Sequence, residues 1–410
     1  MFMATWNIKK LKDVTTKIGS GATPRGGKGA YHHEGTPLIR SLNIYDLNFI
    51  YDNLAFIDDS QAKQLANVIV EKDDVLLNIT GASVCRCTSV PDNLIPARVN
   101  QHVSIIRADR KNLSGKYLKY ALVSPLYKRA LYGLATTGAT REALTKSDIE
   151  NFEIKLPDIE MQKHISSVLS AYDDLIENNQ KRIKGLEGMA QLLYIEWFVK
   201  FKFPGHEATK MVDSGTEYGM IPEGWQIVPI GTMASFVNGY PFKPKDLGDS
   251  GLPIIKIPEL RSGILEKTPR NDGENIPEKY RIKNGDIIFS WSATLLVNIW
   301  NSGHALLNQH LFLVSPKLDL YRSFVFYALT RLVEKLSKQA VGATMQHLRR
   351  DTVVDAKMIL PTEYVLERYE KLAANLLQQI AILQKENQNL CKMRDLLVPQ
   401  LVTGKRTLKA

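Results

Sequence analysis

The chain has 410 residues, of which 44% are hydrophobic and 23% are charged. This length allows two or three folded domains, and the composition excludes a disordered or fibrous protein. Lys and Arg number 53 against 43 Asp and Glu, which gives a net charge of +10 and favours a polyanionic partner such as nucleic acid. On charge alone, a basic globular protein without such a partner is the alternative.

The N-terminal residues lack the apolar core that precedes the cleavage site of a signal peptide, and no segment reaches the roughly 18 apolar residues of a membrane-spanning helix. We therefore expect a cytoplasmic protein that makes no contact with a membrane. Cys85, Cys87 and Cys391 are too few for a disulfide framework and lack the paired spacing of a zinc site. We expect these thiols to be buried or reduced.

Residues 1–157 contain short β-branched and aromatic runs that Gly, Pro, Asn and Asp interrupt. Runs such as residues 68–70 predict strands, and residues 117–122 predict a short amphipathic helix between strands. This mixture predicts an α+β domain over residues 1–157.

Residues 158–202 contain almost no Gly or Pro, and their apolar residues recur at alternating steps of four and three. About 40 such residues form a helix roughly 60 Å long. The pattern is a heptad seam, and the helix is too long to pack on one domain alone, which favours a coiled coil over two separate amphipathic helices. The seam residues of this helix are Ile165, Leu169, Tyr172, Ile176, Asn179, Ile183 and Leu186.

Residues 203–222 lack periodicity and are interpreted as a linker. Residues 223–361 predict a second α+β domain, with strand-like runs at residues 286–289 and 311–314 and a helical run at residues 324–329. Residues 362–403 predict a second long helix, which a basic tail over residues 404–410 follows. The seam residues of the second helix are Leu376, Ile380, Leu383, Asn387, Leu390 and Leu397.

The two halves of the chain form an internal repeat. Landmarks recur in the same order, namely Trp6 as Trp225, Asn100-Gln101-His102 as Asn308-Gln309-His310, Gly138-Ala-Thr140 as Gly342-Ala-Thr344, and Leu156-Pro157 as Leu360-Pro361. Small insertions and deletions lie between these landmarks, as they do between two copies of one fold with different surface loops. The repeat predicts two α+β domains related by a pseudo-twofold axis, each followed by a long helix.

The polar residues of the two seams predict the direction in which the helices pair. Asn387 is the counterpart of Ile183 in the repeat, so the two seam asparagines are not equivalent. Antiparallel pairing places Asn179 opposite Asn387, whereas parallel pairing in the equivalent register places each amide against an aliphatic side chain. We therefore predict that the helices form an antiparallel coiled coil.

The sequence lacks the common catalytic motifs, with no G-x-x-x-x-G-K-[ST], G-x-G-x-x-G, H-E-x-x-H or G-x-S-x-G. Its eight histidines do not share metal-ligand spacing with carboxylates, so we expect no metal site. Glu153-Ile-Lys155 is the nearest match to nuclease chemistry, but Glu153 has no counterpart in the second copy, which favours a solvated strand end. We expect a binding protein without catalytic residues.

This organisation resembles the specificity subunit of type I restriction-modification systems. The resemblance covers essentially the whole chain, through Pro222-Glu-Gly-Trp225, the Asn-Gln-His and Gly-Ala-Thr repeats, and the Leu-Pro landmarks with Gln162 at the first long helix. It implies that each α+β domain is a target-recognition domain that reads one part of a split site in double-stranded DNA. It also implies that the long helices separate these domains and dock two modification (methyltransferase) subunits.

The resemblance places S-adenosylmethionine, ATP and Mg on partner subunits and no cofactor on this chain, and it leaves restriction or motor subunits as a further class of partner. Two alternatives stay open. In one, the chain serves only a methyltransferase. In the other, it is a coiled-coil scaffold whose two α+β domains bind proteins, in which case duplex DNA binding with strong salt dependence should be missing.

Residues that read bases should differ between the two copies, whereas the scaffold and the phosphate contacts should be shared. Long polar residues in divergent loops are therefore the candidates for DNA binding, although each is individually as consistent with a solvated surface side chain. The candidates are Arg25, Lys28, His32, Arg40, Asn43, Asn78, Arg86 and Arg141 in the first domain, and Asn238, Tyr240, Lys243, Lys256, Arg261, Trp291, Gln346 and Arg349 in the second.

The shared motifs carry a different expectation. Asn100, Gln101, Asn308 and Gln309 are expected to hold a turn or contact the backbone rather than read bases. Gly138, Thr140, Gly342 and Thr344 are expected to form turns, which are either ordinary or offer backbone N–H groups to a phosphate.

Overall fold

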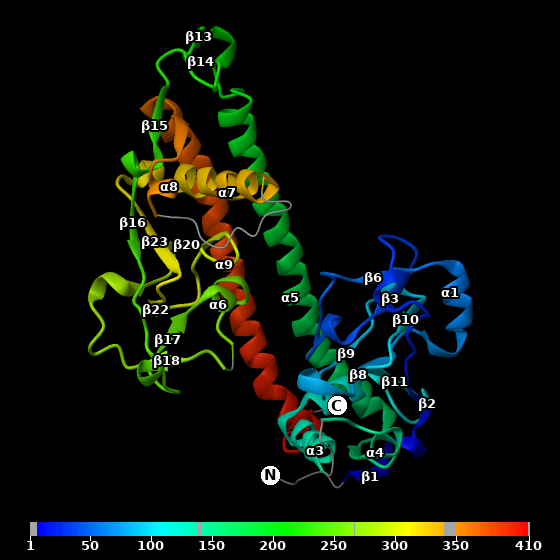
Figure 1. Ribbon diagram of the computed structural model, residues 1–410. Coiled ribbons are helices and arrows are strands. Elements are labelled where there is room, and N and C mark those ends of the chain that lie inside the picture. Colours follow the sequence, from blue (N-terminus) through cyan, green and yellow to red (C-terminus); the bar gives the residue numbers. More distant parts are fainter. Residues whose placement is uncertain (1–5, 138–141, 266, 340–349, 409–410) are drawn as a thin grey trace. The chain divides into compact units, whose positions relative to one another are not determined.

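The computed structural model describes residues 6–137, 142–265, 267–339 and 350–408. Its contacts divide the chain into two compact units: unit 1 contains Met1–Glu177 and Asn389–Ala410, and unit 2 contains Asn178–Gln388. Unit 1 therefore combines the N-terminal part of the chain with its C-terminal end (Figure 1).

Unit 1 contains an antiparallel sheet with the strand order β2-β11-β8-β9 and a second sheet with the order β6-β3-β10-β7, in which β3 and β10 are parallel. Strands β1 and β12 form a separate antiparallel pair, and β4 and β5 form a hairpin. The strands are β1 Asn7–Lys10, β2 Thr15–Ser20, β3 Thr36–Ile39, β4 Ile44–Tyr45, β5 Asn48–Phe49, β6 Ala55–Ile57, β7 Ile69–Val70, β8 Val75–Asn78, β9 Cys87–Ser89, β10 Ala97–Val99, β11 Val103–Ala108 and β12 Glu153–Leu156. The short helices are α1 Asp59–Gln64, α2 Gly115–Val123, α3 Pro125–Thr136 and α4 Lys146–Glu150.

Unit 2 repeats the topology of both four-stranded sheets and of the separate strand pair, but its described residues contain no counterpart of the β4–β5 hairpin. Its antiparallel sheet has the order β16-β23-β20-β21, its second sheet has the order β18-β17-β22-β19 with β17 and β22 parallel, and β15 pairs with β24. The strands are β15 Gln226–Pro229, β16 Ala234–Asn238, β17 Leu252–Ile255, β18 Arg270–Asn271, β19 Arg281–Ile282, β20 Ile287–Ser290, β21 Leu296–Ile299, β22 Ala305–Leu307, β23 Leu311–Pro316 and β24 Lys357–Leu360. The shorter helices are α6 Ile257–Ser262, α7 Arg322–Gln339 and α8 Arg350–Val354. The prediction of two copies of one α+β fold is confirmed.

Alternation along the strands explains why each antiparallel sheet has two buried faces. In unit 1, Val75 and Leu77 pack in a core with helices, whereas Leu76 between them packs against the second sheet. In unit 2, Ile287 and Phe289 face the helices, and Ile288 faces the second sheet. Successive side chains of a strand point to opposite faces, so fully apolar strands of this kind belong in the middle layer of a three-layer arrangement.

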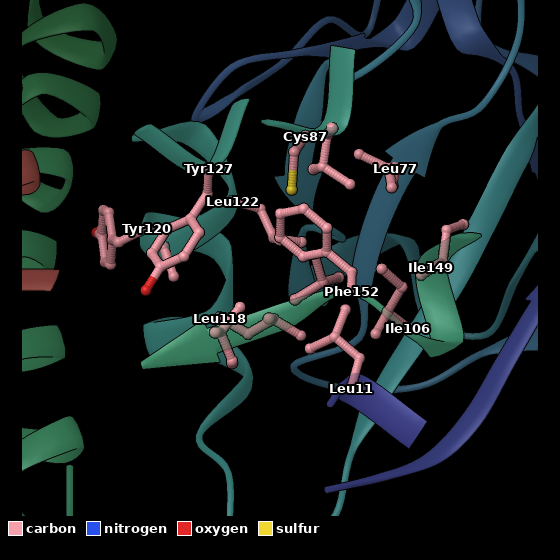
Figure 2. Close-up of a cluster of buried hydrophobic side chains, with 14 of the residues drawn as sticks. Leu11, Leu77, Cys87, Ile106, Leu118, Tyr120, Leu122, Tyr127, Ile149 and Phe152 are labelled. Atoms are coloured by element: carbon pink, nitrogen blue, oxygen red, sulfur yellow. The ribbon is translucent and has the colours of Figure 1, made fainter. Parts of the chain in front are cut away.

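Figure 2 shows the helix-facing core of unit 1. The ring of Phe152 lies among aliphatic side chains from the sheet and from α2, and it meets the ring of Tyr127 edge-on at a centroid distance of 6.1 Å. Leu118 and Leu122 come from α2, so this helix covers the sheet through one face of its 3.6-residue period. Cys87 is part of this core, and Cys85 is also buried.

Two long helices, α5 Ile159–Tyr194 and α9 Glu363–Val402, follow the α+β regions (Figure 1). The first was expected over residues 158–202 but ends at a π-helical segment, Ile195–Val199. It stops there because Phe201 adopts a left-handed backbone conformation with φ of 57° and Pro204 follows shortly after. The connection expected over residues 203–222 contains a short hairpin, β13 Met211–Asp213 with β14 Met220–Pro222.

The contacts of the two helices show how they pair. In unit 1, the start of α5 packs through Ile165 and Leu169 in a core with Val398 and Leu401 from the end of α9. In unit 2, the end of α5 meets the start of α9, where the rings of Tyr194 and Tyr369 lie 6.4 Å apart. The start of each helix thus contacts the end of the other, so the predicted antiparallel pairing is confirmed.

The predicted asparagine contact is present within unit 2. The Nδ2 atom of Asn179 donates a hydrogen bond to Oδ1 of Asn387 at 3.0 Å, and it also lies 3.2 Å from Oε2 of Glu386. Asn179 is only 4% exposed, so its amide needs this partner, and one buried polar pair of this kind fixes the register of a coiled coil. All of the predicted seam residues are buried or half-buried.

In unit 1 an ion-pair network joins the helix ends to α2. The carboxylate of Asp173 on α5 accepts hydrogen bonds from Lys119 at 3.1 Å, from the hydroxyl of Tyr120 at 2.5 Å and from Arg394 on α9 at 2.7 Å. Burial, followed by the negative charge of Asp173, raises the pKa of Tyr120, so the phenol stays protonated and donates. Arg394 lies four residues after Leu390 and three before Leu397, so it continues the seam, and Asp173 compensates its charge there.

Among the described residues, no helix is long and apolar enough to span a lipid bilayer.

We expect Leu169→Ala to lower the free energy of unfolding of unit 1 by about 2–5 kcal/mol, because it removes a fully buried side chain and leaves a cavity. Leu175→Ala on the same helix is the matched control, since its side chain is 51% exposed and its loss should cost less than about 0.5 kcal/mol. Amide hydrogen exchange of the full chain in increasing urea resolves unit 1 from unit 2. Equal effects of the two substitutions would contradict the packing of α5 in unit 1.

Candidate nucleic-acid interface

Each unit gathers the ends of several strands at one edge. In unit 1 the parallel strands β3 and β10 end side by side at Ile39 and Val99, and the chain then crosses to β11 in the other sheet. The first residue of β11, Val103, lies opposite Asn78 at the end of β8, and β2 ends next to it at Ser20. We call this the crossover edge of unit 1. The crossover edge of unit 2 is formed in the same way by the ends of β16, β17, β20 and β22.

The Asn-Gln-His motif forms the crossover turn between the two sheets. In unit 1 the side-chain oxygen of Asn100 accepts a hydrogen bond from the backbone N–H of His102 at 3.2 Å, and the carbonyl of Asn100 accepts from Val103 at 3.1 Å. The matching distances at Asn308 in unit 2 are 3.4 and 3.0 Å. Both asparagines are buried, so their side chains serve the turn.

Gln and His of the motif lie on the outer side of the turn. Gln101 and His102 are exposed, and their side-chain nitrogens are 3.2 Å apart, while the equivalent pair in unit 2 is half-buried with a separation of 3.4 Å. Gln101 also accepts a hydrogen bond from the hydroxyl of Thr23 in the loop that follows β2. The turn is therefore connected to the neighbouring loop by side chains.

A glycine after the first strand of each antiparallel sheet packs directly on the crossover turn. A Cβ atom on Gly21 would lie 2.0 Å from the carbonyl oxygen of Val99, and one on Gly239 would lie 2.2 Å from that of Asn308. No larger residue fits such a close approach of two backbones. Sequence reasoning missed this pair, and the signal that could have found it is the recurrence of Gly immediately after a predicted strand in both copies.

Three predicted residues of unit 1 lie in loops at its crossover edge. Arg25 is exposed in the loop after β2. Arg40 follows β3, donates to the carbonyl of Asn53, and places its guanidinium 5.1 Å from the ring centre of Tyr31. Arg86 lies in the connection from β8 to β9, with its guanidinium 4.2 Å from the ring centre of Tyr45. Stacking on a tyrosine face orients an arginine without removing its hydrogen-bonding edge.

Two predicted candidates of unit 1 require correction, because Asn43 and Asn78 are both 0% exposed. Asn43 accepts from the backbone N–H of Arg40 at 3.0 Å and donates to the carbonyl of Ile50 at 2.8 Å. Asn78 donates to the carbonyl of Ser41 at 2.9 Å. These amides hold the loop after β3 in place and are not accessible to a ligand. The sequence shows only that both positions are polar, whereas their burial results from the fold.

The remaining candidates of unit 1 contribute less to the edge. His32 forms a bridge with Phe56 and approaches the carboxylate of Asp58 at 3.7 Å. Lys28 lies in a 3-10 helix, Gly27–Ala30, and its side chain is outside the described structure. Arg141 and the Gly138-Ala-Thr140 motif also fall outside the described residues.

In unit 2, an indole takes a central place at the crossover edge. Trp291, which follows β20, donates through Nε1 to the side-chain oxygen of Asn238 at 3.2 Å. Its ring stacks on Phe312 at a centroid distance of 5.8 Å and lies 5.9 Å from the ring of His310. The two predicted residues Asn238 and Trp291 are thus brought together.

The other predicted residues of unit 2 lie in the loops around this group. Tyr240 follows β16, with its ring 5.0 Å from Phe242 and 5.4 Å from Tyr280, and Lys243 is exposed in the same loop. Lys256 follows β17 at the position equivalent to Arg40, and its backbone N–H is capped by Glu259 at 3.0 Å. Arg261 is exposed at the end of α6. Gln346, Arg349 and the Gly342-Ala-Thr344 motif lie outside the described residues.

The described residues contain no group of three or more His, Cys, Asp and Glu side chains arranged to hold a metal ion. Burial raises the pKa of the Cys85 thiol to about 12, so this thiol is protonated at neutral pH and is a poor nucleophile. The chemistry available at both edges is hydrogen bonding and ring contact, which suits recognition of a ligand.

Comparison with known sequences identifies the family. The model of the type I restriction modification DNA specificity domain matches residues 3–188 and again residues 222–390, which together cover most of the chain. The chain belongs to the type I restriction-modification DNA specificity family. The double match follows the internal repeat of the sequence and the repeated topology of the two units.

Full-length relatives support this membership. Over 97% of its length the chain is 26% identical to the type I restriction enzyme MjaIX specificity subunit of Methanocaldococcus jannaschii, 93% of which is covered. It is 21% identical to the HindI specificity subunit of Haemophilus influenzae, over 98% of this chain and 100% of that protein. The crystal structure of a type I specificity (S) subunit from M. genitalium aligns over 97% of this chain and 96% of that one, with a TM-score of 0.55 at 15% identity, a likeness of fold.

We expect Gly21→Ala to destabilise unit 1 by about 1–3 kcal/mol, because the added methyl group collides with backbone at the crossover turn. Gly19→Ala, two residues earlier in β2, is the matched control, since nothing lies within 4 Å of its Cβ position. Hydrogen exchange of the turn residues and of β11 should accelerate for the first variant alone. Unchanged exchange in Gly21→Ala would show that the close approach does not constrain the turn.

Proposed function

We propose that this chain is the DNA-recognition subunit of a type I restriction-modification complex and that each unit reads one part of a split DNA site. The observation that carries the proposal is a crossover edge with the same backbone hydrogen bonds in both units but different side chains, exposed or half-buried, in the surrounding loops. Family membership and the net charge of +10 support a DNA ligand.

The shared part of each edge fits a scaffold. The turn asparagines, the glycines beneath them and the capped loops after β3 and β17 recur in both units. The divergent part fits readout, since unit 1 offers Arg25, Arg40 and Arg86 where unit 2 offers a tyrosine, a tryptophan and lysines. Two different readers on one scaffold suit a DNA site whose two parts differ in sequence.

In this proposal the chain itself is not catalytic. Methyl transfer from S-adenosylmethionine takes place on modification subunits, and ATP- and Mg-dependent restriction takes place on further subunits where these are present. The absence of catalytic motifs from the sequence supports this division. A cytoplasmic location, where the DNA lies, follows from the same assignment.

Exposed apolar residues on the long helices support the docking of two copies of one modification subunit. Met189 and Leu192 on α5 are 59% and 55% exposed, and Met393 and Leu396 on α9 are 51% and 67% exposed. The two pairs are equivalent in the repeat, because each residue of the first is separated from its counterpart by 204 positions, as Pro157 is from Pro361. The pair on α5 belongs to unit 2, and the pair on α9 belongs to unit 1.

The presence of an equivalent exposed apolar pair on both long helices has a simple explanation. Residues three apart lie on the same face of a helix, so each pair forms a small apolar patch. Water-exposed apolar residues at equivalent places in both halves fit two identical partners, each of which covers one patch. This supports a complex with two modification subunits per specificity chain.

The proposed function is tested by mapping methylated bases in genomic DNA from cells that express the chain with its modification subunit and from cells that lack only this chain. We expect one bipartite motif to be methylated in the first cells and unmethylated in the second. A map that does not change, with the modification subunit present at equal levels, would refute the DNA-recognition role. Duplex DNA binding by the complex should weaken steeply with salt, since phosphate contacts release counterions.

We expect Leu192→Asp and Leu396→Asp each to reduce the number of bound modification subunits from two to one, because a carboxylate in an apolar contact loses hydration without gaining a partner. Native mass spectrometry of the purified complex counts the subunits. Leu372→Asp is the matched control, because Leu372 is also 50% exposed but its repeat counterpart, Val168, is partly buried against the core. Two subunits retained in both patch variants would argue against docking at these patches.

A further inference from the structure

A hollow in unit 1 lies between the loop after β2 and helix α1. It has a volume of about 610 Å³ and is lined by Thr23, Pro24, Arg25, Gln61, Gln64 and Leu65. Figure 1 shows α1 beside the strands of the β6-β3-β10 sheet, against which Ala62 and Leu65 of this segment pack. The hollow thus adjoins the crossover edge, because Thr23 is hydrogen-bonded to Gln101 of the crossover turn.

The polar side chains of the hollow differ in how firmly they are held. The Oε1 atom of Gln61 accepts a hydrogen bond from the backbone N–H of Asp58 at 3.1 Å, which fixes this amide and leaves its Nε2 as a donor. Within the described part of the chain, the side chains of Arg25 and Gln64 have no hydrogen-bond partner, and both are exposed. The guanidinium N–H donors of Arg25 and the amide donor and acceptor of Gln64 therefore face solvent at the same hollow.

The corresponding place in unit 2 has a different chemistry on the same scaffold. Strands β7 and β19 are equivalent, because each is the antiparallel neighbour of the crossover strand, β10 or β22. Helix α1 precedes β7, whereas Tyr280 precedes β19 and packs with Tyr240 and Phe242 from the loop after β16. The Nζ atom of Lys279 lies 5.0 Å from the ring centre of Tyr280.

This contrast singles out the hollow as a place of sequence readout. Contacts to phosphates are alike for any DNA sequence and would be expected to recur in both units, whereas contacts to bases must change when the two parts of the site differ. Arginine forms two hydrogen bonds with the O6 and N7 atoms of guanine, and glutamine forms two with the N6 and N7 atoms of adenine. Aromatic rings instead offer apolar contact, for example with the methyl group of thymine.

We propose that Arg25 and Gln64 read adjacent purines, a guanine and an adenine, in the major groove of the part of the DNA site that unit 1 recognises, with Gln61 as a fixed neighbouring donor. This inference rests on the proposed DNA-recognition function and names the residues and base types involved. Gln61 and Gln64 were not among the residues expected from the sequence. In this assignment unit 1 reads bases at the hollow by hydrogen bonding, whereas the equivalent place in unit 2 presents aromatic rings.

The test uses the assembled complex of the full chain with its modification subunits and a library of duplexes randomised over both parts of the methylated motif. We expect Gln64→Ala to reduce the preference for adenine at one position of the unit 1 part by about 5- to 150-fold, the loss of one bidentate contact. Lys63→Ala is the matched control, because Lys63 is exposed on α1 but does not line the hollow. It should leave every base preference unchanged.

A second variant keeps the test decisive if the alanine variant is unstable. Gln64→Glu retains the size of the side chain but offers only acceptors, so preference at the same position should move from adenine toward cytosine, whose N4 donates. The part of the site read by unit 2 is the internal control for folding and assembly. An unchanged preference in both Gln64 variants, or an equal loss of binding to all duplexes, would overturn the assignment while the bipartite motif of the wild-type complex still stood. A wild-type complex without a bipartite motif would instead overturn the proposed function.

Discussion

Each unit of this protein depends on the burial of helix ends that come from distant parts of the chain. The core of unit 1 is closed by Val398, Leu401 and Val402 at the end of α9, together with Ile165 and Leu169 at the start of α5. The hydroxyl of Tyr117 in α2 even donates to the carbonyl of Val402, at 3.2 Å. Apolar burial is the main favourable term in folding, so the last turn of α9 contributes to the stability of the first α+β region. Unit 2 has the same requirement at the other ends of the two helices, where Tyr194 and Tyr369 meet.

This exchange of helix ends explains why the polar residues of the seam matter. Leucine and isoleucine alone would tolerate several registers, whereas the Asn179–Asn387 pair is satisfied in only one. The Asp173–Arg394 pair makes a similar demand in unit 1, because either charge would be costly to bury alone. The buried polar groups therefore specify alignment, and the apolar groups supply stability.

The crossover edges show a similar division between a shared scaffold and the side chains available for DNA readout. Backbone hydrogen bonds, the turn asparagines and the close-packed glycines leave little freedom, and they are the features that the two units share. The side chains that project from this rigid frame are free to differ, and they do, from guanidinium and amide in unit 1 to indole and phenol in unit 2. A rigid frame lowers the entropic cost of presenting those side chains to a ligand.

The sequence by itself determined the α+β class, the duplication, the two long helices and their antiparallel direction, because periodicity, repeated landmarks and the two asparagines are local or pairwise signals. It also placed Arg25, Arg40, Arg86, Trp291 and Tyr240 among the candidates, since these are long or aromatic residues in divergent loops.

Only the tertiary structure decided which of these side chains face outward. It buried Asn43 and Asn78 in the scaffold and brought Gln61 and Gln64, which lie 36 and 39 residues further along the chain, beside Arg25. It also assigned the end of the chain to the core of the first unit. The physical reason is that exposure and adjacency at these positions depend on strand pairing and layer packing across long separations in sequence, which no local pattern of residue types encodes.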